Sequence, residues 1–290
     1  MSGNYIWPFI VLYMLATCNT LQQGSPSGLS IEPFPAIETF VTPDLYNTKV
    51  QHSSTKVLIS TGYSGYNLTR KTEVVASENS NVICEDLEEF PMEIYGAVGA
   101  NLVSKPIICG GADGDYGSSD KCFKYMARGW QHFATMIERR HYAAGIVYNN
   151  ALHIFGGADF GDDFDPPTVL QSSEIVKEDG SSTEGPQLPT PIFAHAIASI
   201  NSTVSIITGG LELDTDTESD KTWYFNHARQ KFQPGPNLLE ARRRHSSGTV
   251  TDQETGEKMT IIAGGYSNGN LDSTEMLLNG EWMAGKTHTE

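Results

Sequence analysis

Short segments in which small or apolar residues alternate with polar ones recur along the chain. Alternation over about four to eight residues is typical of β-strands that bury one side. The segments are 95–103 YGAVGANLV, 142–149 YAAGIVYN, 193–200 FAHAIASI and 245–250 HSSGTV. Each predicts a half-buried strand, and together they favour an all-β fold.

A second apolar segment follows each of these strands and ends in two glycines. The copies are 107–111 IICGG, 153–157 HIFGG, 206–210 IITGG and 261–265 IIAGG, and 57–62 VLISTG is an earlier copy with Thr61 in place of the first glycine. The spacing between copies is about fifty residues. Self-similarity at such a period is typical of propellers and other repeat folds.

Two further strands complete each unit. A polar loop follows the glycines, then a third strand, and then an aromatic residue that introduces a fourth strand; Trp130, Phe232 and Trp282 hold this last position. The third strands are 72–77 TEVVAS, 122–127 CFKYMA, 173–178 SEIVKE, 222–227 TWYFNH and 274–279 TEMLLN. Four strands per unit is the architecture of a propeller blade, so the sequence predicts five four-stranded antiparallel blades.

The repeated residue types suit the packing of such blades. The innermost strands crowd together near the axis, which favours small side chains there. Glycine pairs let a neighbouring backbone approach closely and supply positive φ at a turn. Large aromatic side chains of the outer strands fill the wedge between blades, which widens with distance from the axis.

A doubled glycine at this period, followed by a strand with an aromatic residue, a Trp and an Arg-containing start of the next unit, resembles the kelch repeat. The Arg element is present as 138–145 ERRHYAAG and 241–248 ARRRHSSG. The resemblance covers residues 57 to about 285 and implies a kelch-type β-propeller, usually of six blades and sometimes of five or seven, that binds other proteins. Two alternatives follow for this chain: five blades that close the ring, or an incomplete six-bladed ring.

The N-terminal residues have the pattern of a secretory signal peptide. No Lys, Arg, Asp or Glu precedes Glu32, and the apolar run 5–16 is shorter than the roughly 20 residues of a membrane span. We expect a signal peptide at 1–18, a linker or partial closing segment at 19–50 and the kelch β-propeller at 51–290. The protein would then be secreted; an uncleaved anchor and a wrongly assigned start site are the alternatives.

Composition narrows the classes of partner. The chain has 290 residues, of which 39% are hydrophobic, and a formal net charge of −16. Such an acidic chain is repelled by nucleic acid and by anionic lipid, so we expect neither a nucleic-acid partner nor a membrane span. A protein partner fits better, one of basic character in particular, and the sequence defines no oligomeric state.

Cysteines and glycosylation motifs fit a secretory compartment. Cys109 ends a second strand and Cys122 begins the adjacent third strand, so an antiparallel pair would bring them within reach of a disulfide. Cys84 is left over, and three reduced cysteines in a cytosolic protein are the alternative. Asn67 and Asn201 each begin an Asn-x-Thr acceptor in an expected loop, which predicts glycosylation at both.

Acidic loops follow the glycine pairs in three successive units. Loops between equivalent strands emerge on one face of a propeller, so these carboxylates should share a rim. The candidate partner-binding residues are Asp113, Asp115, Asp162, Asp163, Asp214 and Asp216. A solvated rim without a ligand, a basic protein partner and a Ca²⁺ site are the three interpretations of this charge.

Other motifs give no support for catalysis. The segment 265–269 GYSNG matches a nucleophile-elbow pattern, but a strand rather than a helix is expected after Ser267. The eight histidines show no metal-binding spacing. We therefore predict a non-catalytic binding module without cofactor or metal. The alternatives are a secreted propeller enzyme that acts on carbohydrate or as an oxidase, and an intracellular kelch adaptor.

Overall fold

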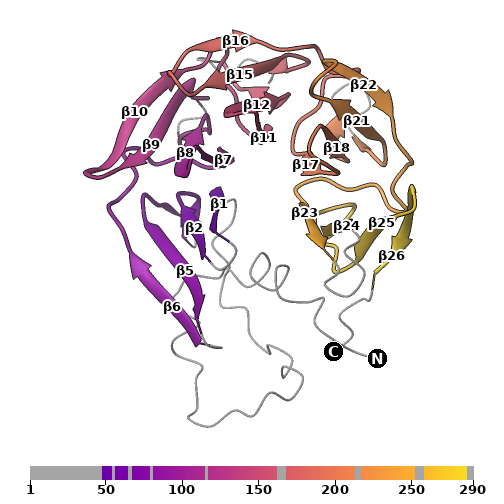
Figure 1. The fold of residues 1–290 in the computed structure, drawn as a ribbon, viewed down its shortest axis with the longest axis horizontal. Helices are drawn as coiled ribbons and strands as arrows, with labels where there is room; N and C mark the ends of the chain where they lie inside the picture. The colour runs from indigo at the N-terminus through magenta and orange to yellow at the C-terminus, as the bar shows by residue number, and fades with distance from the viewer. Residues whose placement is uncertain are drawn as a thin grey trace.

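The computed structural model describes residues 48–53, 56–64, 67–78, 81–114, 117–161, 168–212, 217–251 and 258–285. The regular structure of this part is entirely β, and it forms five four-stranded antiparallel sheets arranged around a common centre (Figure 1). The predicted β-propeller with five visible blades is therefore confirmed. No helix in the described ranges is long and apolar enough to cross a bilayer.

Strands follow the chain order within each blade, from the centre outward (Figure 1). Blades one and two contain β1 (Thr48–Ser53), β2 (Lys56–Ser60), β5 (Thr72–Glu78), β6 (Asn81–Asp86), β7 (Val98–Leu102), β8 (Lys105–Cys109), β9 (Lys121–Met126) and β10 (Gly129–Thr135). Blades three and four contain β11 (Ala144–Tyr148), β12 (Ala151–Phe155), β15 (Ser173–Lys177), β16 (Ser182–Glu184), β17 (Ala196–Ser199), β18 (Val204–Thr208), β21 (Thr222–Asn226) and β22 (Lys231–Pro234). Blade five contains β23 (Ser246–Thr251), β24 (Lys258–Ala263), β25 (Thr274–Leu278) and β26 (Glu281–Ala284).

Blade one begins with a strand that the repeat pattern does not reveal. β1 starts at Thr48, so it overlaps the end of the segment 19–50 that we expected to be a linker or a partial closing segment. Its sequence, TKVQHS, is mostly polar. The strand pairs with β2 and also contacts β7 of the next blade, so partners elsewhere in the fold define it.

The innermost strands approach one another so closely that side chains must be small. A Cβ atom added to Gly145 of β11 would lie 2.4 Å from the Val98 side chain of β7. Successive inner strands contact each other in the order β1, β7, β11, β17 and β23. A sector without described strands separates blade five from blade one in Figure 1.

In blades one to four, the glycines after the second strand join the blade to the connection that follows it. The second glycine donates its N–H to a carbonyl of that connection, as from Gly111 to Arg140 at 2.9 Å and from Gly210 to Arg242 at 2.8 Å. The first glycine lies closer still, since a Cβ on Gly209 would be 2.3 Å from the Arg242 carbonyl oxygen. Both glycines have positive φ. The predicted reason for the doublet, close approach plus left-handed backbone, is confirmed.

Aromatic side chains of the fourth strands pack between blades, as expected. Trp282 belongs to a buried cluster with Ile206 and Leu238 of blade four, and its indole N–H donates to the Pro236 carbonyl at 3.0 Å. Trp130 packs in the same way against residues of blade one. Trp282 is buried and Trp130 half-buried, and the apolar surface that both remove from water stabilises the contact between blades.

Cys109 and Cys122 form the predicted disulfide. The two residues face each other in the β8–β9 register, and their Cα atoms are 4.0 Å apart. Both cysteines are buried in the core between blades two and three. Cys84 lies in β6, and its side chain is outside the described part of the structure.

Two fully buried arginines fix the connections that lead into blades three and five. Arg242 donates from Nη1 to the Gly264 carbonyl at 2.8 Å and from Nη2 to Glu275 Oε1 at 2.9 Å. Glu275 in turn accepts the N–H groups of Leu239 and Glu240 at 2.8 and 3.1 Å. The carboxylate thus binds both the arginine and the backbone that carries it.

The same network occurs one hundred residues earlier in blade three. Arg140 donates to the Gly156 carbonyl at 2.6 Å and to Glu174 at 2.7 Å. Glu174 also accepts the backbone N–H groups of Ile137 and Glu138. The equivalent positions before blades two and four are isoleucines, Ile94 and Ile192, so polar and apolar connections alternate around the ring.

Candidate functional site

Two kinds of connection lie on one face of the propeller, which we call the loop face. In blades two to five, an isolated bridge pairs a residue shortly before the first strand with the loop after the second strand of the same blade, as between Tyr95 and Ala112 and between Arg243 and Tyr266. The loops between the second and third strands of a blade, which we call second-to-third loops, contribute the described residues of 61–71, 110–120, 156–172, 209–221 and 264–273. The segments that join one blade to the next, the blade connections, contribute 87–97, 136–143, 185–195 and 235–245.

Each second-to-third loop is folded back as a short hairpin. Three form two-stranded sheets, and in blades two and five a single bridge takes their place, Ala112 with Ser118 and Tyr266 with Asn270. The sheets are β3 (Tyr63–Ser64) with β4 (Asn67–Leu68), β13 (Ala158–Asp159) with β14 (Thr168–Val169), and β19 (Leu211–Glu212) with β20 (Thr217–Glu218). The loops are therefore presented in similar orientations by all five blades.

A chain of backbone hydrogen bonds runs from blade to blade at the inner edge of this face. Tyr142 N–H donates to the Gly96 carbonyl at 2.7 Å, Ala194 N–H to Tyr142 at 2.8 Å, and Arg244 N–H to Ala194 at 2.7 Å. All four residues have φ between 50° and 64°. Non-glycine residues seldom adopt this conformation, so its repetition shows that the interlocking of blades imposes it.

The side chains at this inner edge form an aromatic and cationic cluster. The Arg244 guanidinium carbon lies 5.1 Å from the Tyr142 ring centroid, although the two residues belong to blades five and three. Tyr142 also packs against the rings of Tyr95 at 5.7 Å and Phe193 at 6.5 Å. Arg244 is exposed. Tyr142 and Arg244 thus offer a cation and an aromatic surface next to the propeller axis.

Blade five adds a second stacked arginine. Arg243 lies 5.0 Å from the Tyr266 ring centroid, and its Nε is 3.2 Å from the Glu218 carboxylate of blade four. Tyr266 is 36% exposed. Arginine and tyrosine are among the residues enriched in protein interfaces, so this part of the face has the chemistry of a contact surface.

His141 is part of the scaffold of the loop face. Its Nδ1 lies 3.0 Å from Ser118 Oγ, which also accepts the Phe160 N–H at 3.2 Å. The His141 ring packs 4.0 Å from the Phe160 ring. Burial lowers the pKa of His141 to about 4, so the imidazole is neutral at pH 7 and joins the blade-two hairpin to blade three.

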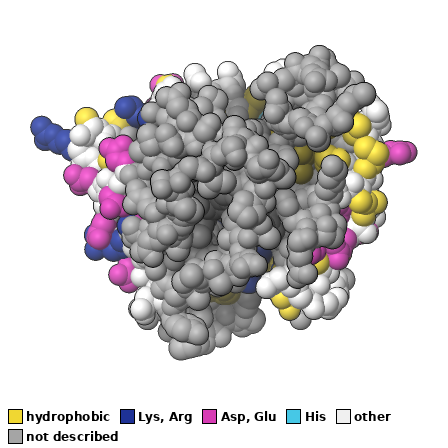
Figure 2. Space-filling view, turned by 90° about the horizontal axis from the view of Figure 1, so that it is seen from below, with side chains coloured by type: hydrophobic (Ala, Val, Ile, Leu, Met, Phe, Trp, Pro, Cys, Tyr) yellow, Lys and Arg dark blue, Asp and Glu magenta, His cyan; other side chains and the backbone are white. Residues whose placement is uncertain are grey.

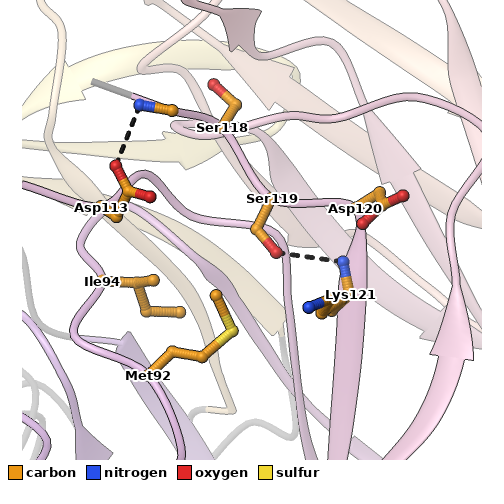
Figure 3. Close-up of a pocket in the computed structure, with 8 residues that line it drawn as sticks. Met92, Ile94, Asp113, Ser118, Ser119, Asp120 and Lys121 are labelled. Carbon is orange, nitrogen blue, oxygen red and sulfur yellow. Dashed lines mark hydrogen bonds between the residues drawn. The ribbon is translucent and has the colours of Figure 1, made fainter. Parts of the chain in front are cut away.

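A pocket of about 150 Å³ opens beside the hairpin of blade two (Figure 3). Met92 and Ile94, from the connection between blades one and two, form its apolar part. Its polar part comes from the second-to-third loop: Asp113, Gly117, Ser118, Ser119, Asp120 and Lys121. Asp113 Oδ1 accepts the Gly117 N–H at 3.0 Å, which orients the carboxylate.

Of the six predicted rim residues, Asp113 is exposed on the loop face and lines this pocket. Asp115, Asp162, Asp163, Asp214 and Asp216 lie outside the described residues. Within the ranges that the structure describes, no group of three His, Cys, Asp or Glu side chains is placed to hold a metal ion. Ser267 lies in a turn between two strands, β24 and β25.

Sequence reasoning missed two features: the cluster around Tyr142 and Arg244 next to the propeller axis, which we call the axial cluster, and the blade-two pocket. Arg244 belongs to the segment ARRRHSSG, which we interpreted as a repeat element, and Tyr142 to a predicted strand. The available signal was the presence of large side chains, Tyr142 and Arg244, where Gly96 and Ala194 occupy the equivalent positions. A large side chain at a repeat position where other blades have Gly or Ala indicates a feature specific to that blade.

Comparison with known proteins identifies the fold. No family profile matches the sequence, and no curated protein matches it either. Among solved structures, that of YjhT superposes with a TM-score of 0.70 over 83% of this chain and 83% of YjhT, at 12% sequence identity. The fold is a β-propeller. This propeller presents its axial cluster and the blade-two pocket on the same loop face.

Proposed function

We propose that the chain is a secreted, glycosylated propeller of the kelch type that binds another protein through the loop face. The observation that carries the proposal is the set of five equivalent hairpins, held on one face by the glycine contacts and the blade-to-blade hydrogen bonds. A rigid scaffold that presents loops on one side is a common design of binding surfaces. The repeated glycine pairs and the arginine elements support the kelch assignment.

The proposed partner carries basic groups. The net charge of −16 favours association with a positively charged surface, and Asp113 places a carboxylate on the loop face. The exposed Tyr266 and Arg244 supply aromatic and guanidinium contacts of the kind found in interface centres. The proposed role is non-catalytic and needs no cofactor.

Secretion is tested with the two acceptor asparagines, both of which are exposed. Asn67 lies on the loop face of blade one, and Asn201 lies on the opposite face, in the turn between β17 and β18. A tagged chain expressed in animal cells should enter the medium and lose mass on glycosidase treatment. Asn67→Gln and Asn201→Gln should each remove one glycan. A chain that stays inside the cell with unchanged mass would contradict this part of the proposal.

Binding through the loop face is tested by matched charge reversals. Asp113→Lys/Asp272→Lys changes two exposed carboxylates on the loop face, whereas Glu178→Lys/Asp179→Lys changes two on the turn between β15 and β16 at the opposite face. Both variants shift the net charge equally. Proteins that the wild type captures by cross-linking in the medium should be retained by the opposite-face variant and lost, roughly tenfold or more, by the loop-face variant. Equal retention by both variants would refute the proposed face.

A further inference from the structure

The blade-two pocket combines an apolar wall with carboxylates. Figure 3 shows the Asp113 carboxylate above the Ile94 and Met92 side chains, with Ser119 and Lys121 beside them. Ile94 is buried and Met92 half-buried, so the apolar wall is firmly held. Asp120 lies at the other side of the pocket from Asp113 in this view.

The neighbouring blades show what the Asp113 position binds. Asp113, Asp159 and Glu212 are each the second residue after a glycine pair, in blades two, three and four. Glu212 binds the Lys221 ammonium at 3.1 Å from both carboxylate oxygens, and Asp159 lies 3.4 Å from Arg139 Nε. In both blades, this carboxylate position therefore receives a basic side chain of the protein itself.

On the basis of the proposed function, we propose that the blade-two pocket receives a basic side chain, arginine or lysine, of the bound protein. The long methylene stem of such a residue would lie on Met92 and Ile94, and its cationic head would reach Asp113 and Asp120. Basic residues commonly bury their stems on apolar surface while the charge stays at a polar edge. A carboxylate offers about four lone-pair sites, so Asp113 can accept the Gly117 N–H and a cation together.

Lys121 competes for this pocket. It is the counterpart of Lys221 within the shared sequence Ser-Asp-Lys, and it lines the pocket in blade two. The Lys121 ammonium therefore repels a cation of the partner that enters the pocket. Removal of that charge should strengthen the binding of a basic ligand.

The test uses the full secreted chain and a small probe, N-acetyl-L-arginine methylamide, with the uncharged citrulline analogue as control. Saturation-transfer NMR should show saturable binding of the arginine probe, with the strongest transfer to its methylene protons. Asp113→Asn and Asp120→Asn should each weaken binding about fivefold, while Lys121→Gln should strengthen it. The matched control Glu178→Gln, an exposed carboxylate on the opposite face, should leave binding unchanged.

Equal signals from the arginine and citrulline probes, or equal effects of Asp113→Asn and Glu178→Gln, would overturn the inference. Unchanged melting temperatures of the Asn variants establish that weaker binding is not unfolding. Failure of the probe while the wild type still captures a partner through the loop face would overturn the pocket alone. Probe binding without any captured partner would overturn the proposed function and leave the pocket.

Discussion

Replacement of Arg242 by methionine is expected to lower the free energy of unfolding by about 4 kcal/mol. The Arg242 side chain is fully buried, and its partner Glu275 has a side chain only 3% exposed. Without the guanidinium, Glu275 keeps its buried negative charge with two backbone N–H groups as its remaining donors. Removal of one partner of a buried pair is costly because the other charge stays uncompensated.

Chemical denaturation followed by tryptophan fluorescence measures this loss. Arg244→Met is the matched control, since Arg244 belongs to the same run of three arginines but is exposed, and it should cost no more than about 1 kcal/mol. Arg242→Met/Glu275→Leu should recover much of the stability lost by the single variant, because it removes both charges. Equal losses from Arg242→Met and Arg244→Met would contradict the assigned role of the buried pair.

Acidification is expected to destabilise the protein between pH 6.5 and pH 4. Burial lowers the pKa of four histidines from 6.5 to about 4, and of His245 to about 3; the four are His141, His153, His195 and His227. A histidine that stays neutral in the folded state but becomes protonated in the unfolded state makes its full contribution to the free energy of unfolding above pH 6.5. This contribution is lost as the pH falls toward the pKa of the histidine in the folded state. His195 alone would contribute about 3 kcal/mol.

All five histidines lose their stabilising contribution over the same pH range, so the protein should unfold at a lower urea concentration at pH 5 than at pH 7.5. Urea titrations at several pH values measure the slope. His245→Gln keeps a donor or acceptor for Thr208 Oγ1, 2.8 Å from His245 Nε2, and should flatten the pH dependence. The exposed His132, changed to Gln, should not. Equal stability at pH 7.5 and pH 5 would contradict the account.

The sequence predicted the features that depend on neighbouring strands. The second strands, the glycine pairs and the Cys109–Cys122 disulfide all follow from local spacing, because adjacent antiparallel strands place these residues together. The strand β1 could not be recognised, because TKVQHS has no apolar pattern of its own and is defined by its pairing with β2.

The site depends on contacts between distant parts of the chain. Tyr142 and Arg244 meet because blades three and five converge near the axis, which a repeat pattern predicts only in outline. Of three consecutive arginines, Arg242 is buried in an ion pair, and Arg243 and Arg244 both lie over tyrosine rings, Arg243 half-buried and Arg244 exposed. Backbone geometry decides these three roles, since the residue type is the same.

Hydrogen–deuterium exchange of the protein, alone and with a captured partner, tests the proposed binding face most directly. We expect slower exchange in the described loops and connections of the loop face, including 117–121 and 264–271, and unchanged exchange in the turns of the opposite face at 149–150 and 178–181. Protection confined to those opposite turns, with the loop face unaffected, would contradict the account.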